Sequence, residues 1–169
     1  PSLKGGFVHG GVIWLGGLSS TVTDKIGGIF KENVAYADNS DAHGGVLYLN
    51  QGTITALDGT YEKNRAESDK ANAAGGVIFS KKNINSISQT VFTGNTAKGY
   101  EGNQYYEATG GAIYNNGTIG KIENSSFSGN IAQAYKALGG AIYNASTPGD
   151  IGVVKEIINT SFTDNQTIG

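Results

Sequence analysis

The stretch GGAIYNNGTIGKIENSSFSGN (110–130) contains the two motifs that decide the fold. It opens with a pair of glycines, and 17 positions after the first glycine comes an aromatic residue followed, three positions later, by asparagine. The same double motif occurs five times in the 169-residue chain, in copies of 29 to 35 residues, with the separation of 17 in the middle three copies and separations of 20 and 23 in the outer two. Internal repeats of this length predict a stack of similar structural units. The glycine pairs begin at Gly10, Gly44, Gly75, Gly110 and Gly139, and the aromatic residues are Phe30, Tyr61, Phe92, Phe127 and Phe162.

Each copy consists of short segments rich in Ile, Val, Tyr, Phe and Thr, which favour β-strands, and no segment keeps a helical period over ten residues. Two or three short strands per copy cannot bury an apolar face alone, whereas stacked copies share a continuous core. We therefore expect an all-β fold, a right-handed parallel β-helix (solenoid) of about five coils. Residues 1–169 are expected to form one segment of a longer chain, with copies at about 10–43, 44–74, 75–109, 110–138 and 139–169.

Stacking places each residue over its equivalent in the next coil, about 4.8 Å away, so that repeated residues form columns. The five aromatic residues of the motif form one column, and the glycine pairs mark a corner where φ is positive or two backbones approach closely. An aliphatic column is expected from Ile13, Leu47, Ile78, Ile113 and Ile142. A polar column, with amide groups that hydrogen-bond from coil to coil, is expected from Asn33, Asn64, Asn95, Asn130 and Asn165.

The connections from each asparagine to the next glycine pair vary in length and composition, and all leave from the same corner of the coil. They run 35–43, 66–74, 97–109 and 132–138. Tyrosine in loops offers a large contact surface with a polar tip, so this edge is predicted to bind a ligand. In the alternative interpretation, the rings only cover the flank of the helix. The tyrosines concerned are Tyr36, Tyr100, Tyr105, Tyr106 and Tyr135.

A second aromatic position follows each glycine pair, at Trp14, Tyr48, Phe79, Tyr114 and Tyr143. Because neighbouring strand residues point to opposite faces, a column beside the inward aliphatic one points outward. An exposed aromatic stripe is typical of a binding face or of a surface that another segment covers, and we favour covering by the flanking loops. The last copy also contains the insertion ASTPGDIGVVK (145–155), which is expected to form a loop or an added strand.

Charge and composition argue against several kinds of partner. The formal net charge is −2, Arg65 is the only arginine and the lysines are scattered, so no nucleic-acid partner is expected. No apolar run is long enough to cross a bilayer, so this segment is not expected to insert into a membrane. The chain has no cysteine, and His9 with His43 would make an incomplete metal site. We expect no metal and no cofactor.

Catalysis is a third hypothesis, because many parallel β-helices cleave polysaccharides. Such sites combine clustered carboxylates with a basic residue, or use two carboxylates on either side of a glycosidic bond. Here no two acidic residues occupy equivalent positions in adjacent coils with a basic residue between them. Asp38 and Asp41 lie close together only in a polar loop. We therefore expect a protein that is not an enzyme and has no catalytic residues.

The GGA(I/L/V) and FxxN motifs resemble the double motif of the chlamydial polymorphic outer-membrane proteins. The stretch 110–132 also resembles repeats in autotransporter passengers and adhesin-like surface proteins, and the likeness extends from Gly10 to Asn165. Two copies have GGAI, the others have GGVI or GGVL, and Tyr61 replaces phenylalanine in one copy. The resemblance implies a right-handed parallel β-helix, type V export across the outer membrane and a role in adhesion at the cell surface or outside the cell.

These observations favour a passenger-domain segment of an exported bacterial surface adhesin. In this hypothesis the β-helix is a stiff stalk and its loops contact a host-cell protein or a glycan receptor. The alternative is a structural subunit or segment of a filament, spike or phage tail fibre, whose partners are neighbouring copies of itself. The polysaccharide-active enzyme comes third.

Overall fold

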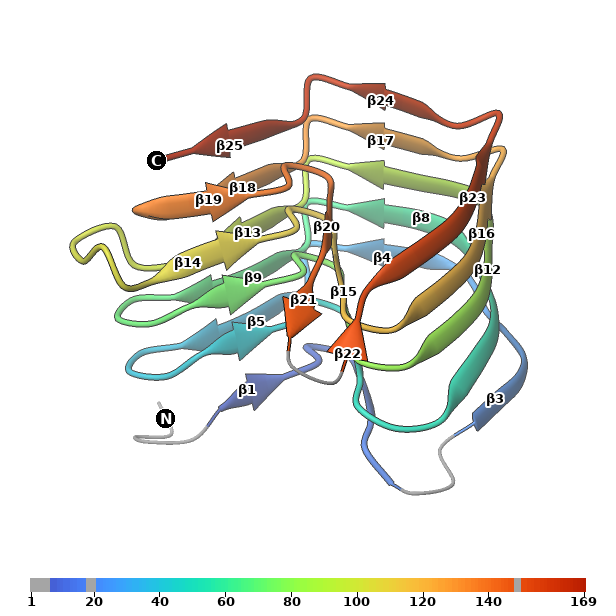
Figure 1. The fold of residues 1–169 in the computed structure, drawn as a ribbon, viewed down its shortest axis with the longest axis horizontal. Helices are drawn as coiled ribbons and strands as arrows, with labels where there is room; N and C mark the ends of the chain where they lie inside the picture. Colours follow the sequence, from blue (N-terminus) through green and yellow to red (C-terminus); the bar gives the residue numbers. More distant parts are fainter. Residues whose placement is uncertain (1–6, 18–20, 148–149) are drawn as a thin grey trace.

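The computed structural model describes residues 7–17, 21–147 and 150–169, and these residues form a coil of β-strands with no helix (Figure 1). Each turn of the coil stacks on the previous one, so that equivalent strands lie side by side and pair in parallel. The predicted fold class, an all-β parallel solenoid of about five coils, is confirmed. Each coil contributes strands to four sheets, A to D, where the sequence predicted two or three strands per copy.

Sheets A and B form the two walls on either side of the glycine pairs. Sheet A contains β1 (Val8–His9), β6 (Ala42–His43), β10 (Ala73–Ala74), β14 (Glu107–Thr109) and β19 (Lys136–Leu138). Sheet B contains β2 (Ile13–Leu15), β7 (Leu47–Leu49), β11 (Ile78–Ser80), β15 (Ile113–Asn115) and β20 (Ile142–Asn144).

Sheets C and D complete each turn. Sheet C contains β3 (Thr21–Ile26), β4 (Ile29–Lys31), β8 (Thr53–Glu62), β12 (Asn83–Thr93), β16 (Thr118–Glu123), β17 (Ser126–Ser128), β23 (Val153–Ile158) and β24 (Ser161–Thr163). Sheet D contains β5 (Val34–Ala37), β9 (Arg65–Ser68), β13 (Thr96–Lys98), β18 (Ile131–Gln133) and β25 (Gln166–Ile168). In the 145–155 insertion, β21 (Ser146–Thr147) pairs antiparallel with β22 (Asp150–Ile151), which confirms the expectation of an added strand.

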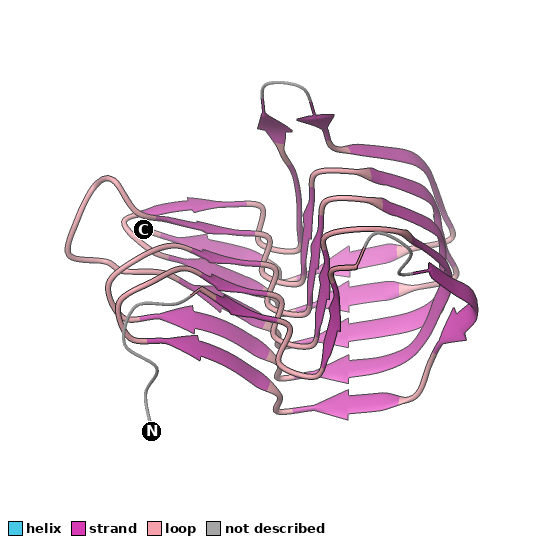
Figure 2. Ribbon diagram, turned by 90° about the horizontal axis from the view of Figure 1, so that it is seen from below, coloured by secondary structure: helices cyan, strands magenta, loops and turns pink. Residues whose placement is uncertain are grey.

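The cross-section has a wide part and a thin part (Figure 2). Between sheets B and C lies the main core, where large aliphatic and aromatic side chains are fully buried. Between sheets A and D the buried side chains are mostly alanine, so these two sheets pack closely as a thin slab. The D-to-A connections wrap the free edge of this slab. The outer faces of sheets A and B therefore meet at a concave corner.

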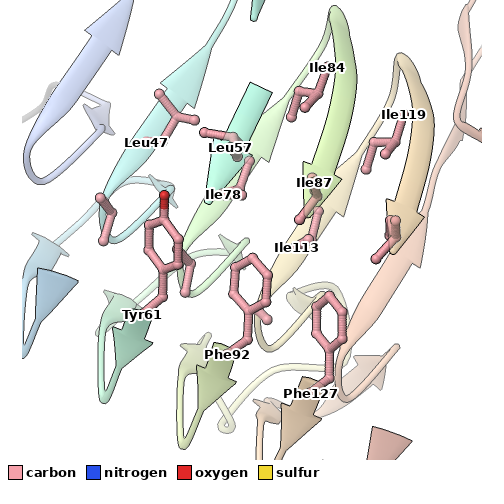
Figure 3. Packing of buried hydrophobic residues seen from close by; sticks show 14 of the residues in the cluster. Leu47, Leu57, Tyr61, Ile78, Ile84, Ile87, Phe92, Ile113, Ile119 and Phe127 are labelled. Carbon is pink, nitrogen blue, oxygen red and sulfur yellow. The ribbon is translucent and has the colours of Figure 1, made fainter. Parts of the chain in front are cut away.

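The aliphatic and aromatic columns form in the predicted register. Ile78 pairs with Leu47 on one side and with Ile113 on the other, and Phe92 pairs with Tyr61 and with Phe127. The ring centroids of Phe92 and Phe127 are 4.6 Å apart with planes 11° from parallel, and Figure 3 shows this stacking beside the isoleucines. Burial of such side chains contributes about 1.5–3 kcal/mol each, so this core is the main source of stability.

The asparagine column forms a continuous hydrogen-bonded ladder. The fully buried Asn95 donates from Nδ2 to Asn130 Oδ1 at 2.9 Å and to the Tyr61 carbonyl at 2.9 Å. Its Oδ1 accepts hydrogen bonds from the backbone N of Asn64 at 2.9 Å and from Asn64 Nδ2 at 3.0 Å. Asn64 and Asn130 repeat this pattern. Each of these amides uses both protons and accepts two bonds, which only the Asn side chain can do at this corner.

The two glycines of each pair are required for different reasons. The first, such as Gly75, has φ of 63°, a conformation that costs other residues energy. At the second, Gly76, a Cβ would lie 2.1 Å from the Gly111 carbonyl oxygen and 2.6 Å from the Thr96 carbonyl oxygen. Thr96 directly follows the asparagine of the same copy. The GG and FxxN motifs therefore occur together because their backbones are in contact within one coil.

Replacing Gly76 with alanine is expected to lower the free energy of unfolding by about 3 kcal/mol or more, because the added methyl group overlaps rigid backbone on two sides. Urea unfolding followed by circular dichroism measures the change. Gly129→Ala is the matched control: Gly129 has φ of 62°, but nothing lies within 4 Å of a Cβ placed there. Gly129→Ala is expected to lower the free energy of unfolding by about 1–2 kcal/mol. Equal losses in the two variants would contradict the close-contact explanation.

Candidate functional site

The loop edge carries the five tyrosines predicted to bind a ligand. The structure places them in different environments. Tyr36 lies in strand β5, although the sequence placed it in a connection, and its hydroxyl donates to the Asp69 carboxylate. This hydrogen bond is the main reason why the pKa of Tyr36 rises to about 12. The rings of Tyr100 and Tyr106 meet edge to face, with centroids 6.0 Å apart. The backbone N of Tyr135 donates to the Tyr100 carbonyl, which joins two neighbouring loops.

A shallow hollow of about 280 Å³ lies at this edge, and Tyr100 lines it. Its other lining residues are Ser68, Asp69, Lys98, Gly99, Glu101 and Gly102. Tyr105, which is 77% exposed, does not line this hollow and instead lines a larger groove on the outer faces of sheets A and B. The loop tyrosines therefore do not form one site. Their role in binding stays a prediction.

The aromatic stripe on sheet B forms a cluster of its own, apart from the main core. The prediction of an exposed stripe is wrong at Tyr48 and Phe79, which are only 4% exposed, whereas Trp14 is 58% exposed. Tyr114 and Tyr143 are half-buried. Part of the cover comes from the flanking connections, as we favoured, but from their last residues, which form sheet A: His43, at the end of 35–43, stacks on Phe79, and Ala74, at the end of 66–74, packs in the same cluster.

Two histidines fill this corner, one in each of the first two strands of sheet A, β1 and β6. The His9 ring stacks on Tyr48 at 4.1 Å between centroids, and the His43 ring stacks on Phe79 at 4.2 Å. Burial lowers the pKa of His43 to about 3, with smaller contributions from His9 and Lys81. Burial, and to a smaller extent the charge of Lys81, also lower the pKa of His9, and the nearby Asp41 partly offsets this shift. Both imidazoles act as neutral packing groups.

In the next two strands of sheet A, β10 and β14, smaller residues take the place of the histidines. Ala74 and Thr109 occupy the equivalent positions on sheet A, in register with His43. A groove of about 460 Å³ opens beside them, over the aromatic rings of the later coils. Its lining residues are Asp41, His43, Asn72, Ala74, Phe79, Tyr105, Glu107, Thr109, Tyr114, Tyr143, Ala145, Ser146 and Thr147.

A short polar ladder forms one wall of this groove. Asn72 donates from its backbone N and from Nδ2 to Asp41 Oδ1, at 3.0 Å in both cases, and its own Oδ1 accepts a hydrogen bond from the backbone N of Glu107 at 2.8 Å. The Glu107 carboxylate also forms an ion pair with Lys136. Lys81 does not line the groove, but its Nζ lies 5.8 Å from the centre of the Phe79 ring, which does. The groove thus combines aromatic surface with hydrogen-bonding groups.

Our sequence interpretation missed this groove and the polar residues in its wall. The signal is present directly before each glycine pair, where the chain has His9, His43, Ala74, Thr109 and Leu138. In this column the two imidazole rings are followed by the small side chains of Ala74 and Thr109. This change in size predicts a space beside the third and fourth strands of sheet A, β10 and β14. Recognising it required knowing that this column faces the aromatic stripe, which only the angle between sheets A and B shows.

Neither a metal centre nor a membrane-spanning helix is found in the described ranges of the chain. No three His, Asp or Glu side chains there come together to hold a metal ion. Those residues also include no helix long and apolar enough to cross a bilayer.

Comparison with known families identifies the repeat. Residues 89–116 and 124–145 match the family described as the Chlamydia polymorphic membrane protein repeat. Over these two stretches the chain is similar to this repeat. Each matched stretch contains an FxxN motif followed by the next glycine pair. The resemblance that the sequence indicated is thereby confirmed. No curated protein and no solved structure matches the chain.

The two matches to the polymorphic membrane protein repeat lie in the third to fifth coils and cover well under half of the chain. They include the longest loop and several groove residues, such as Tyr114 and Tyr143. Asp41 and Asn72, which form the polar wall, lie outside the matched stretches. The family description associates this repeat with membrane proteins in general.

Proposed function

We propose that this chain is part of the passenger of an autotransporter-like protein, is held at the bacterial cell surface and acts in adhesion. The observation that carries the proposal is the polymorphic membrane protein repeat, folded as a stack of in-register coils. The stack supplies a stiff rod because every coil is fixed to its neighbours by parallel strand pairing and by the asparagine ladder. Loops of variable length emerge along one edge and are free to differ without changing the rod.

Contact with a partner, not catalysis, is the role that the groove and the loop edge support. Both groove carboxylates are already engaged, Asp41 by Asn72 and Glu107 by Lys136. The loop edge offers the exposed rings of Tyr100 and Tyr135. A host-cell protein or a glycan is the kind of partner that such a surface fits.

Surface location is tested on intact cells of the source organism with an antibody raised against residues 21–147. We expect a polypeptide much larger than 17.5 kDa in the outer-membrane fraction, and its loss when intact cells are treated with protease. A periplasmic protein that survives the same treatment is the control for cell integrity. A protein of the chain's own size inside the cell, protected from protease, would contradict the proposal.

A further inference from the structure

The two histidines at the concave corner form one stacked cluster with two aromatic rings of sheet B. The rings of His9 and His43 are parallel within 6°, with centroids 5.3 Å apart. His9 lies on Tyr48 at 4.1 Å, and His43 lies on Phe79 at 4.2 Å. Tyr48 and Phe79 are both 4% exposed, and the imidazoles provide part of their cover.

Only the neutral form of His43 suits this position. Among the described residues, its Nδ1 is buried and has no hydrogen-bond partner. A neutral imidazole tolerates this because its proton can be on Nε2, whereas an imidazolium carries a proton on both nitrogens. The charged ring would thus bury an N–H group without an acceptor, which costs more than a cation–π contact with Phe79 returns. His43 therefore has to leave the stack to take up a proton.

The groups around the stack oppose protonation of both rings. Burial, and then His9 and Lys81, lower the pKa of His43. Burial and then Lys81 lower the pKa of His9, and Asp41 offsets only part of this shift. Burial raises the pKa of Tyr48, so this phenol stays neutral and supplies no compensating negative charge. The closed stack is therefore an uncharged state of the corner.

The two imidazoles are coupled because each shields the other from water. When one ring turns out of the stack, the face of the other ring at 5.3 Å loses its neighbour and is open to solvent. Outside the stack, each ring binds a proton at its ordinary pKa of about 6.5. Opening of the corner thus takes up more than one proton, and its pH dependence is steeper than that of a single histidine.

We propose that His9 and His43 form an acid-sensitive cover over Tyr48 and Phe79. At neutral pH the uncharged imidazoles lie on the two rings. In acid they take up protons, turn out of the corner into solvent and uncover the aromatic faces. This device goes beyond the proposed function. It uses no residue of the loop edge, so it can fail while surface location holds, or hold while surface location fails.

The test follows the imidazoles of the purified chain, labelled with ¹³C at histidine, by NMR between pH 7.5 and pH 5. Ring currents shift the imidazole protons as long as the stack is closed, and relaxation dispersion detects the opened form as a minor species. Opened His43 binds a proton near pH 6.5, whereas burial lowers the pKa of the closed form to about 3. We therefore expect the opened population to rise about 30-fold or more from pH 7.5 to pH 5.

Variants at the two histidines separate their contributions. His43→Phe keeps a ring on Phe79 that cannot be protonated, so we expect the acid-driven opening of this ring to be lost. His9→Phe leaves one titrating ring, so the opened population should rise at most tenfold per pH unit, whereas the wild type exceeds this between pH 6 and pH 5. Tyr135→Ala at the loop edge is the control and is expected to open as the wild type does.

A second measurement reports the uncovered rings themselves. A neutral fluorescent dye that responds to apolar surface is added at pH 7.5 and at pH 5, while circular dichroism checks that the chain stays folded. We expect the fluorescence to rise at pH 5 in the wild type and in Tyr135→Ala, but not in His43→Phe.

Opening that grows steeply in acid and is lost in His43→Phe supports the proposal. Three results would overturn it: imidazolium rings that stay stacked, acid-driven dye binding that persists in a folded His43→Phe variant, or global unfolding with no opened form before it.

Discussion

Replacing Asn95 with alanine is expected to lower the free energy of unfolding by about 4 kcal/mol, which is large for one polar side chain. Asn95 is fully buried, and its amide makes four hydrogen bonds that span three coils. Alanine leaves the Asn64 amide and the Tyr61 carbonyl without these partners, in a place closed to water. Denaturant unfolding of the purified chain, monitored by circular dichroism, measures the loss.

Two further variants show whether the ladder itself is responsible. Asn33 is only half-buried and its side chain donates to Asn64 Oδ1, so Asn33→Ala is expected to cost about 1 kcal/mol. Asn95→Asp keeps the shape and the two acceptor contacts, but it cannot donate to Tyr61 or Asn130 and it brings a charge into the interior. It is expected to destabilise about as strongly as alanine. An Asp variant as stable as wild type would show that the donated hydrogen bonds do not matter.

Acidification from pH 7.5 to pH 5 is expected to cost the chain about 2 kcal/mol through His43. In the unfolded chain this imidazole binds a proton near pH 6.5, whereas burial between His9 and Phe79 lowers its pKa in the folded chain to about 3. Protonation therefore stabilises the unfolded state first. The contribution of neutral His43 to the free energy of unfolding is fully present above pH 6.5. It falls as the pH drops below 6.5 and stops falling near pH 3. Urea midpoints at several pH values give the profile.

His43→Phe keeps a flat ring in the stack and removes the titration. We expect the variant to be as stable at pH 5 as at pH 7.5, apart from a smaller loss through His9, whose pKa is lowered in the same direction. Comparing the two proteins above pH 5 keeps most aspartates and glutamates ionised, so the difference belongs to His43. A parallel loss in both proteins between pH 7.5 and 5 would show that His43 is free to take up a proton in the folded chain.

The repeat made the scaffold predictable before the structure was known. Residues such as Ile78, Phe92 and Asn95 recur at fixed places in each copy, and parallel stacking allows only one register in which all three columns align. The glycine pair was predictable for the same reason. One glycine takes a positive φ and the other allows contact between backbones, and both requirements recur in every coil.

The candidate sites were harder to predict because they depend on angles between sheets. Alternation along a strand correctly separates the stripe from the main core, but it does not tell whether another sheet covers it, and at Tyr48 and Phe79 one does. The position of Tyr36 in strand β5 was missed because its segment lies between an FxxN motif and the next glycine pair and was treated as a variable connection. The groove needed residues from four sources, namely sheet A, sheet B, the connections from sheet D to sheet A and strand β21, which lie in separate parts of the sequence.

The in-register columns also have a consequence for how such a protein can evolve. A coil pairs only with the coils directly above and below it, so a whole copy is the natural unit of change in the gene. Duplicating a segment such as 75–109 in frame would lengthen the rod by one step of about 4.8 Å and leave every column intact. Losing a few residues within a strand would break several columns at once, whereas changing a connecting loop alters none. Length and surface chemistry can therefore vary independently, each without disturbing the core.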